Sequence, residues 1–244
     1  MTTGGSVRLP HAALDQASRR LKAMKIERIL GLERSSRPYD LLEIGCGSGW
    51  ISHYFATHPE IPFRVMAVDV HDSRVVHEGY EYVPVYGVDL PFPEASFDVV
   101  ISNHVIEHVG DRDAQLAHLR EIGRVLRPGG VGYLAVPNRW MITEPHYRLK
   151  FLSWLPRPWR SPYLRWMGKG EFYDCEPLQV GELEDLLDRA GLGYRNACIE
   201  GMRLTCEMEM PDHLLTKMLR RVPDSALRVM VPVIPTLIYR VGCC

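Results

Sequence analysis

The chain has 244 residues, a formal net charge of -1 at pH 7, and 46% hydrophobic and 24% charged residues. This is the composition of a globular protein, and the length fits one domain that carries an insertion. The near-zero charge excludes a general attraction to nucleic acid or to an anionic membrane, so such binding would need a local basic patch.

The predicted elements begin with a flexible tail over residues 1–10 and an amphipathic helix over residues 11–32. Short apolar runs then alternate with stretches of helical periodicity. Strands are expected at 39–44, 63–68, 82–86, 97–102 and 131–136, with helices at 50–57 and 111–126. This alternation predicts a Rossmann-like α/β fold, in which helices cover both faces of a mostly parallel sheet.

Residues 138–176 interrupt this alternation, because they are rich in Pro, Trp and Arg and show little periodicity. We interpret them as an insertion after the fifth strand that covers the substrate, within a single domain over residues 11–244. Helices are then expected at 179–190 and 211–221, and strands at 193–199 and 202–208. The apolar segment 226–241 is expected to pack on the core, with contact to a membrane surface as the alternative.

The most informative motif follows the first predicted strand and reads Glu43-Ile44-Gly45-Cys46-Gly47-Ser48-Gly49. Glycines let a ligand approach the backbone closely, and the helix that begins after them offers free N–H groups. A dinucleotide-binding turn is the rival interpretation, but its third glycine would fall on Trp50.

Two acids follow later strands, where ligands of a parallel sheet bind. Asp69 lies 20 positions after Gly49, at the end of the second predicted strand, and a carboxylate there can accept both ribose hydroxyls of a nucleoside. Asp89 follows the third strand and can accept from an adenine amino group, while Leu90 packs on the ring.

With these motifs, the chain resembles the class I methyltransferases that use S-adenosylmethionine (SAM), in particular the ubiquinone-biosynthesis-like group. The resemblance covers roughly residues 40–137 and includes the segments 96–100, 106–109 and 126–130. It implies a seven-stranded sheet whose last strand is antiparallel, and SAM as the cofactor. The cofactor-binding residues that it implies are Glu43, Gly45, Gly47, Gly49, Asp69, Val70, Asp89, Leu90 and Asn103.

Methyl transfer to a hydroxyl needs a base that takes the hydroxyl proton, and a histidine suits this role at neutral pH. The resemblance places His104, just after the fourth strand, at the methyl-transfer site. His146, at the start of the insertion, is the second candidate, whereas we expect His108 to be structural.

We expect no bound metal. Residues 104–108 are similar to the Glu-x-x-Glu-His segment of metal-dependent RNA 2′-O-methyltransferases, but His104 replaces the first acid and residues 170–174 lack the later histidine. Hard oxygen ligands for magnesium are therefore too few. The six cysteines show no Cys-x-x-Cys spacing, which argues against structural zinc. Their small number is typical of a reducing compartment, so we expect a cytoplasmic protein, with a peripheral position at the membrane left open.

The acceptor is expected to bind at residues 138–170, which hold four of the five tryptophans and a net charge of +6. This stretch loosely resembles methyltransferases of bacterial glycolipid and cell-surface glycan synthesis. The resemblance favours a hydroxyl of a glycan, a glycolipid or a small secondary metabolite, with membrane contact through 138–170 or 226–241. An RNA or tRNA methyltransferase and a SAM-binding protein without catalysis are the alternatives. Nucleic acid is the less favoured partner, because no separate RNA-binding module is visible.

Overall fold

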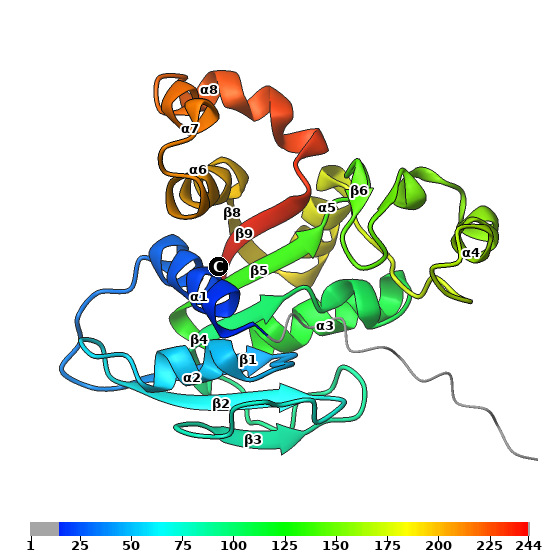
Figure 1. The fold of residues 1–244 in the computed structure, drawn as a ribbon. Coiled ribbons are helices and arrows are strands. Elements are labelled where there is room, and N and C mark those ends of the chain that lie inside the picture. Colours follow the sequence, from blue (N-terminus) through cyan, green and yellow to red (C-terminus); the bar gives the residue numbers. More distant parts are fainter. Residues whose placement is uncertain (1–14, 244) are drawn as a thin grey trace, which may run out of the picture.

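The computed structural model describes residues 15–243, which form a twisted seven-stranded sheet covered by helices on both faces (Figure 1). The strands, in chain order, are β1 Tyr39–Ile44, β2 Phe63–Asp69, β3 Glu81–Pro84, β4 Phe97–Asn103, β5 Leu126–Pro137, β8 Leu192–Asn196 and β9 Thr236–Cys243. Their order across the sheet is β3-β2-β1-β4-β5-β9-β8, and β9 runs antiparallel to both β5 and β8, whereas the other pairs are parallel. The predicted fold class is confirmed.

Alternate residues of the central strands face opposite helical layers, as the period of two in a strand requires. Leu41 and Val99 face the layer of α1 Gln16–Leu30 and α2 Trp50–Ala56. Leu42 and Val100 face the layer of α3 Arg112–Val125 and α5 Val180–Ala190. Burial on both faces explains why these strands are nearly continuous apolar runs.

The helix ends follow local chemistry. Asp15 and Asp111 accept hydrogen bonds from the first backbone N–H groups of α1 and α3, so they cap these helices. Gln179 and Glu182 form a reciprocal capping box at the start of α5, and Gly191 ends it in the left-handed conformation. The predicted tail over residues 1–10 lies outside the described residues.

One predicted strand is wrong. Residues 202–208 belong to the helix α6 Cys198–Glu209, which packs beside α1 (Figure 1). Met202, Leu204 and Cys206 alternate with polar residues like a strand, but Cys198, Met202 and Cys206 also recur every four residues like a helix. The expected strand at 193–199 is the shorter β8, because α6 begins at Cys198.

The last strand lies in the apolar segment 226–241 instead. β9 pairs with β5 on one side and β8 on the other, so residues 236–241 form part of the sheet and cannot lie on a membrane. Before it, α7 Leu214–Leu219, α8 Asp224–Leu227 and the 3-10 helix η3 Arg228–Val233 form a small cap. No helix among the described residues is long and apolar enough to cross a bilayer.

Residues 138–176 lie between β5 and α5 and extend away from the sheet (Figure 1). They contain the hairpin β6 Thr143–Glu144 and β7 Leu149–Lys150, then η2 Leu152–Trp154 and α4 Arg157–Trp166. A small apolar cluster of their own supports them, with Leu149, Leu152, Leu164 and Tyr173 at its centre.

Candidate active site

The glycine motif forms a tight turn between β1 and α2. Gly45, Gly47 and Gly49 all have positive φ, at 72°, 50° and 79°, which other residues rarely adopt. A Cβ atom on Gly45 would lie 2.4 Å from Val105 Cγ2, and one on Gly49 would lie 2.1 Å from Tyr80 Oη. The turn therefore requires glycine on grounds of both conformation and space.

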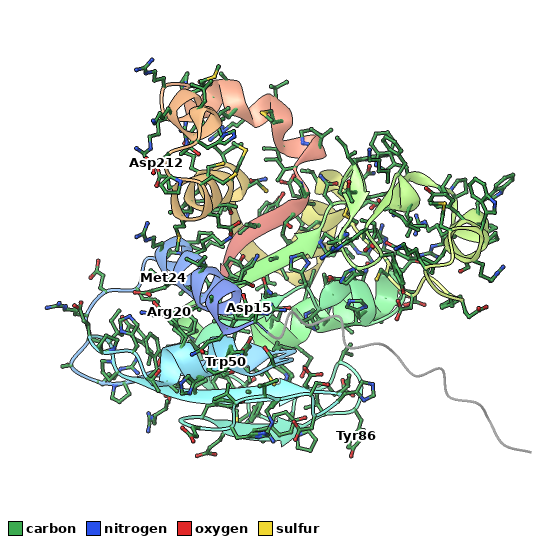
Figure 2. All side chains as sticks on the ribbon, in the orientation of Figure 1. Asp15, Arg20, Met24, Trp50, Tyr86 and Asp212 are labelled. Carbon is green, nitrogen blue, oxygen red and sulfur yellow. The ribbon has the colours of Figure 1, made fainter. Side chains whose placement is uncertain are left out.

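Trp50 stands where a dinucleotide-binding turn would have its third glycine. It opens α2 on the side of the sheet that α1 covers, where Figure 2 labels it close to Arg20. Trp50 and Arg20 line the same surface hollow between α1 and α2. A bulky side chain is thus accommodated at the position of the third dinucleotide-binding glycine.

Asp69 holds the glycine turn in place from the end of β2. The Gly47 N–H donates to Asp69 Oδ2 at 2.9 Å, and the His71 N–H donates to Asp69 Oδ1 at 3.2 Å. Each carboxylate oxygen keeps a further lone pair, which a ligand hydroxyl can use. Val70 beside it is exposed, so the backbone around Asp69 is accessible.

Glu43 lies fully enclosed under the turn, where it accepts a hydrogen bond from the Ser52 hydroxyl of α2. Burial raises the pKa of Glu43 to about 8, against the opposing effects of Ser52 and Arg19. A cation bound at the turn would favour the ionised form of this acid. The narrow glycine cradle, the buried acid and the carboxylate of Asp69 fit SAM, which carries a positive charge and a ribose.

The predicted adenine-binding segment is fixed by α3. The Leu90 N–H donates to Glu121 Oε2 at 2.8 Å, and Arg124 Nη2 donates to the Leu90 carbonyl at 3.0 Å. Leu90 is buried and Asp89 is exposed. Our sequence prediction did not include Glu121 and Arg124, although their spacing of three on a predicted helix was a usable signal.

Asn103 and His104 lie together at the carboxyl end of β4. His104 has a φ of +59°, and its backbone N–H donates to the Ala135 carbonyl of β5 at 2.9 Å. Its Nδ1 lies 3.3 Å from Glu107 Oε1. This contact is an ion pair without hydrogen-bond geometry, because neither carboxylate oxygen of Glu107 accepts a hydrogen bond within residues 15–243. The next residue, Val105, packs on the glycine turn.

Glu107 itself is fully buried in the 3-10 helix η1 Ile106–His108. Burial alone would raise the pKa of Glu107, but His104 and His108 beside it hold the pKa below its usual value. The carboxylate thus stays negative between two histidines.

His146 lies in the hairpin of the insertion, and its side chain is only 10% exposed. Its Nδ1 is 2.6 Å from Glu144 Oε1, and its ring packs edge-on against His108 with 5.3 Å between the ring centres. Burial opposes the charged form, but the hydrogen bond and charge of Glu144 raise the pKa of His146 above its usual value. The structure therefore packs His146 against His108.

Cys175 and Asp174 complete this corner, and the sequence prediction missed them. Cys175 Sγ lies 3.8 Å from His108 Nδ1 and 3.9 Å from His146 Nδ1. Cys175 lies 67 positions after His108 and 29 positions after His146, so no local spacing could indicate these contacts.

Known proteins are similar to this chain in sequence and in fold. A family profile described as a methyltransferase domain matches residues 42–134. A probable S-adenosylmethionine-dependent methyltransferase of Mycolicibacterium smegmatis is 40% identical over 105 residues, which are 41% of this chain and 38% of the relative. A ubiquinone biosynthesis O-methyltransferase of Ruegeria pomeroyi is 30% identical over 188 residues, which are 73% of this chain and 69% of the relative.

A solved structure extends the likeness to the whole fold. A chain in the complex between a Haloferax volcanii methyltransferase and its activator Trm112 aligns with 93% of this chain and 93% of its own length, at a TM-score of 0.57 and 16% identity. The chain therefore belongs to the SAM-dependent methyltransferases, and SAM is the cofactor of that family. The mycobacterial relative is matched over little more than a third of its own length.

Proposed function

We propose that this chain transfers the methyl group of SAM to an acceptor hydroxyl, with His104 as the general base. SAM supplies a methyl group that its sulfonium has already activated. The remaining task is to align the acceptor and to remove its proton. The relative from Ruegeria pomeroyi is named an O-methyltransferase, which supports a hydroxyl as the acceptor group.

The contact between His104 and Glu107 carries this proposal. A buried carboxylate at Nδ1 favours the tautomer whose Nε2 is free to accept a proton, and it stabilises the imidazolium that forms. His146 remains a predicted base, but its Nδ1 is already paired with Glu144 and its side chain is mostly covered. We therefore favour His104.

Replacing His104 by Asn tests the base directly. Asn tolerates the left-handed conformation that His104 adopts, so the variant removes the imidazole without straining the backbone. Methyl transfer should fall roughly 100-fold or more, while SAM affinity stays unchanged. Radiolabelled methyl transfer to lipid, glycan and RNA fractions measures the first quantity, and calorimetric titration measures the second. The matched control is His77→Asn, at an exposed site.

Unchanged transfer in His104→Asn would contradict the role of His104. If the wild-type chain binds SAM but transfers no methyl group to any fraction, the chain is a SAM-binding protein without catalysis. Labelling of the RNA fraction alone would favour the RNA methyltransferase alternative.

We further propose that the acceptor is carried at an anionic lipid surface, as a glycolipid would be. The tryptophans of the insertion fall into two pairs. Trp140 and Trp154 pack edge-on at 5.5 Å and donate to Gln179 and to the Met141 carbonyl. Trp159 and Trp166 on α4 are 68% and 81% exposed.

Cations surround the exposed pair. Arg165 and Lys169 are exposed on or directly after α4, and Arg157, also exposed, pairs with Glu176 at 2.8 Å. Exposed tryptophans beside cations are typical of helices that lie in a membrane interface and attract anionic lipid. The packed pair would fix the insertion over the acceptor while α4 contacts the lipid.

Vesicle sedimentation tests this surface. The chain should bind vesicles of phosphatidylcholine with roughly one third phosphatidylglycerol more tightly than vesicles of phosphatidylcholine alone. The double variant Trp159→Ala/Trp166→Ala should weaken that binding roughly tenfold or more, because two apolar side chains no longer enter the interface. The matched control is Tyr86→Ala, an exposed aromatic residue labelled far from α4 in Figure 2. Equal binding of all three proteins would refute the proposed surface.

A further inference from the structure

Six side chains that can ligate a metal meet where the insertion touches the core. They come from three separate segments: η1 after β4, the β6–β7 hairpin, and the stretch before α5. The six are Glu107, His108, Glu144, His146, Asp174 and Cys175. They form three overlapping groups, and within each group one ligand atom per residue lies within 4.8 Å of the others. The groups are Glu107–His108–His146, His108–Asp174–Cys175 and Glu144–His146–Cys175.

The separations at Cys175 suit one metal ion. Its Sγ is 3.8 Å from His108 Nδ1 and 3.9 Å from His146 Nδ1. In a tetrahedral zinc site, with Zn–S of about 2.3 Å and Zn–N of about 2.0–2.1 Å, the sulfur and a nitrogen are roughly 3.6 Å apart. Each S–N separation is therefore within a few tenths of an ångström of the ligand value, and a turn of the His108 ring would bring both histidines to the same ion.

We propose that Cys175, His146 and Glu144, which form one of these groups, bind a divalent transition metal of the zinc type, with His108 as the fourth ligand. A thiolate and two imidazoles are ligands that suit zinc and do not suit magnesium. Glu144 Oε1 lies 2.6 Å from His146 Nδ1 and is fully buried, so the metal would replace the proton that these two atoms share. Binding releases that proton and the thiol proton of Cys175.

Glu107 provides independent support. It is fully buried, and neither of its carboxylate oxygens accepts a hydrogen bond from the described residues. Its Oε1 lies 3.9 Å from His108 Nε2, on the side of the ring away from the nitrogen that faces Cys175. At 3.9 Å these two atoms are not hydrogen-bonded, but a small turn of the ring that brings Nδ1 to a metal would let Nε2–H donate to this carboxylate, as the second N–H of a histidine ligand commonly does.

Charge points in the same direction. Glu107 and Glu144 are both fully buried within this corner, and buried carboxylates are costly without compensating positive charge. A divalent cation bound to Glu144 would add to the positive charge that the neighbouring histidines supply. The expectation of no metal rested on counting hard oxygen ligands within 104–108 and 170–174, and it did not consider a thiolate or a ligand from the hairpin.

The metal would fasten the insertion to the sheet. His108 follows β4, His146 lies in the hairpin and Cys175 leads into α5, so one ion would join both ends of the insertion to the core. The Glu176 N–H already donates to the Glu107 carbonyl at 2.8 Å across the same junction. This structural role does not depend on the methyl acceptor or on His104.

Cobalt reports on the site without any assay of activity. The full chain, first stripped with a chelator, is titrated with Co²⁺, which gives strong thiolate-to-metal absorption when a cysteine ligates it. We expect this absorption to saturate at about one Co²⁺ per chain and to disappear when Zn²⁺ is added. Zn²⁺ should also raise the Tm of the stripped protein, because it binds only the folded chain.

The variant Cys175→Ser should lose both the absorption and the rise in Tm. The matched control Cys206→Ser, which changes a buried cysteine of α6, should keep both. If Cys175→Ser fails to fold, His146→Gln provides the second test, and it should weaken Co²⁺ binding at least tenfold. Absence of thiolate absorption in the folded wild-type chain, or its persistence in Cys175→Ser, would overturn the proposal.

Discussion

The molecule has two ligand-facing regions that are built from different parts of the chain. The glycine turn and Asp69 offer backbone N–H groups and positive-φ glycines, and the required space is set by Val105 and Tyr80. The junction of the insertion offers side chains instead, and most of them are titratable. A backbone cradle changes little when side chains are substituted, whereas a side-chain cluster can be rebuilt by single substitutions. If the acceptor binds at the insertion, as we propose, this difference would let the fold keep its cofactor while its acceptor varies.

The largest expected effect breaks the backbone cradle. In Gly49→Ala, the new methyl group would meet Tyr80 Oη at 2.1 Å and the Val76 carbonyl at 2.6 Å, at a φ of 79°. The clash and the strained backbone together should cost more than roughly 3 kcal/mol, so SAM affinity should fall by at least about 100-fold. Calorimetric titration measures this loss.

Gly129→Ala separates strain from the cradle. Gly129 also has a positive φ, at 77°, but nothing lies within 4 Å of its added Cβ. This variant should lose about 1 kcal/mol of stability and keep its SAM affinity. Equal loss of affinity in both variants would mean that the turn is not the cofactor cradle.

The next effect concerns β4, which supports both regions. Burial lowers the pKa of His118 on α3 to about 4, and its Nε2 lies 3.0 Å from Ser102 Oγ of β4. Between about pH 6.5 and pH 4 the unfolded chain takes up a proton here that the folded chain does not. The free energy of unfolding should therefore fall as pH falls, by about 3 kcal/mol from this residue between pH 7 and pH 4.

Denaturant titrations across this pH range measure that slope. In His118→Gln the contribution should vanish, so the curves of wild type and variant should converge toward pH 4. The exposed His77→Gln should follow the wild type. A constant difference between wild type and His118→Gln at every pH would contradict the prediction.

The smallest effect compares the two kinds of tryptophan within the insertion. Trp154 is 42% exposed, contacts Trp140 and Phe151, and donates to the Met141 carbonyl, so Trp154→Ala should cost about 1–2 kcal/mol of stability. Trp166 is 81% exposed, and Trp166→Ala should stay within about 0.5 kcal/mol of the wild type. Thermal melting of both variants measures the contrast. Equal losses of stability in the two variants would contradict this contrast.

Much of the sheet could be predicted from the sequence, because buried parallel strands are short apolar runs and their ends carry turn residues. Glu43 and Asp69 follow directly from that pattern, since each lies at the end of a strand beside the glycines. The helix α6 could not be distinguished from a strand by periodicity alone. The packing of this helix on the sheet decides the structure instead. α6 lies so close to β9 at Gly201 that a Cβ there would lie 2.5 Å from Ile238.

The junction at Cys175 lies beyond sequence reasoning for another reason. Metal-site patterns in a sequence depend on short spacings, as in Cys-x-x-Cys. Here η1 and the segment before α5 each contribute one of the proposed ligands and the hairpin contributes two, and only the folded insertion brings them together. His108, expected to be structural, thus has neighbours that could not be predicted from the sequence.

The position of β9 has a consequence for how the chain folds during synthesis. β8 pairs only with β9 in this sheet, and β9 is made about 40 residues after β8. Until residues 236–243 leave the ribosome, β5 presents an open edge and β8 has no partner, and such edges invite pairing with other chains. The last of these seven strands in chain order therefore fills a place inside the sheet, so the sheet is completed by a late, long-range step.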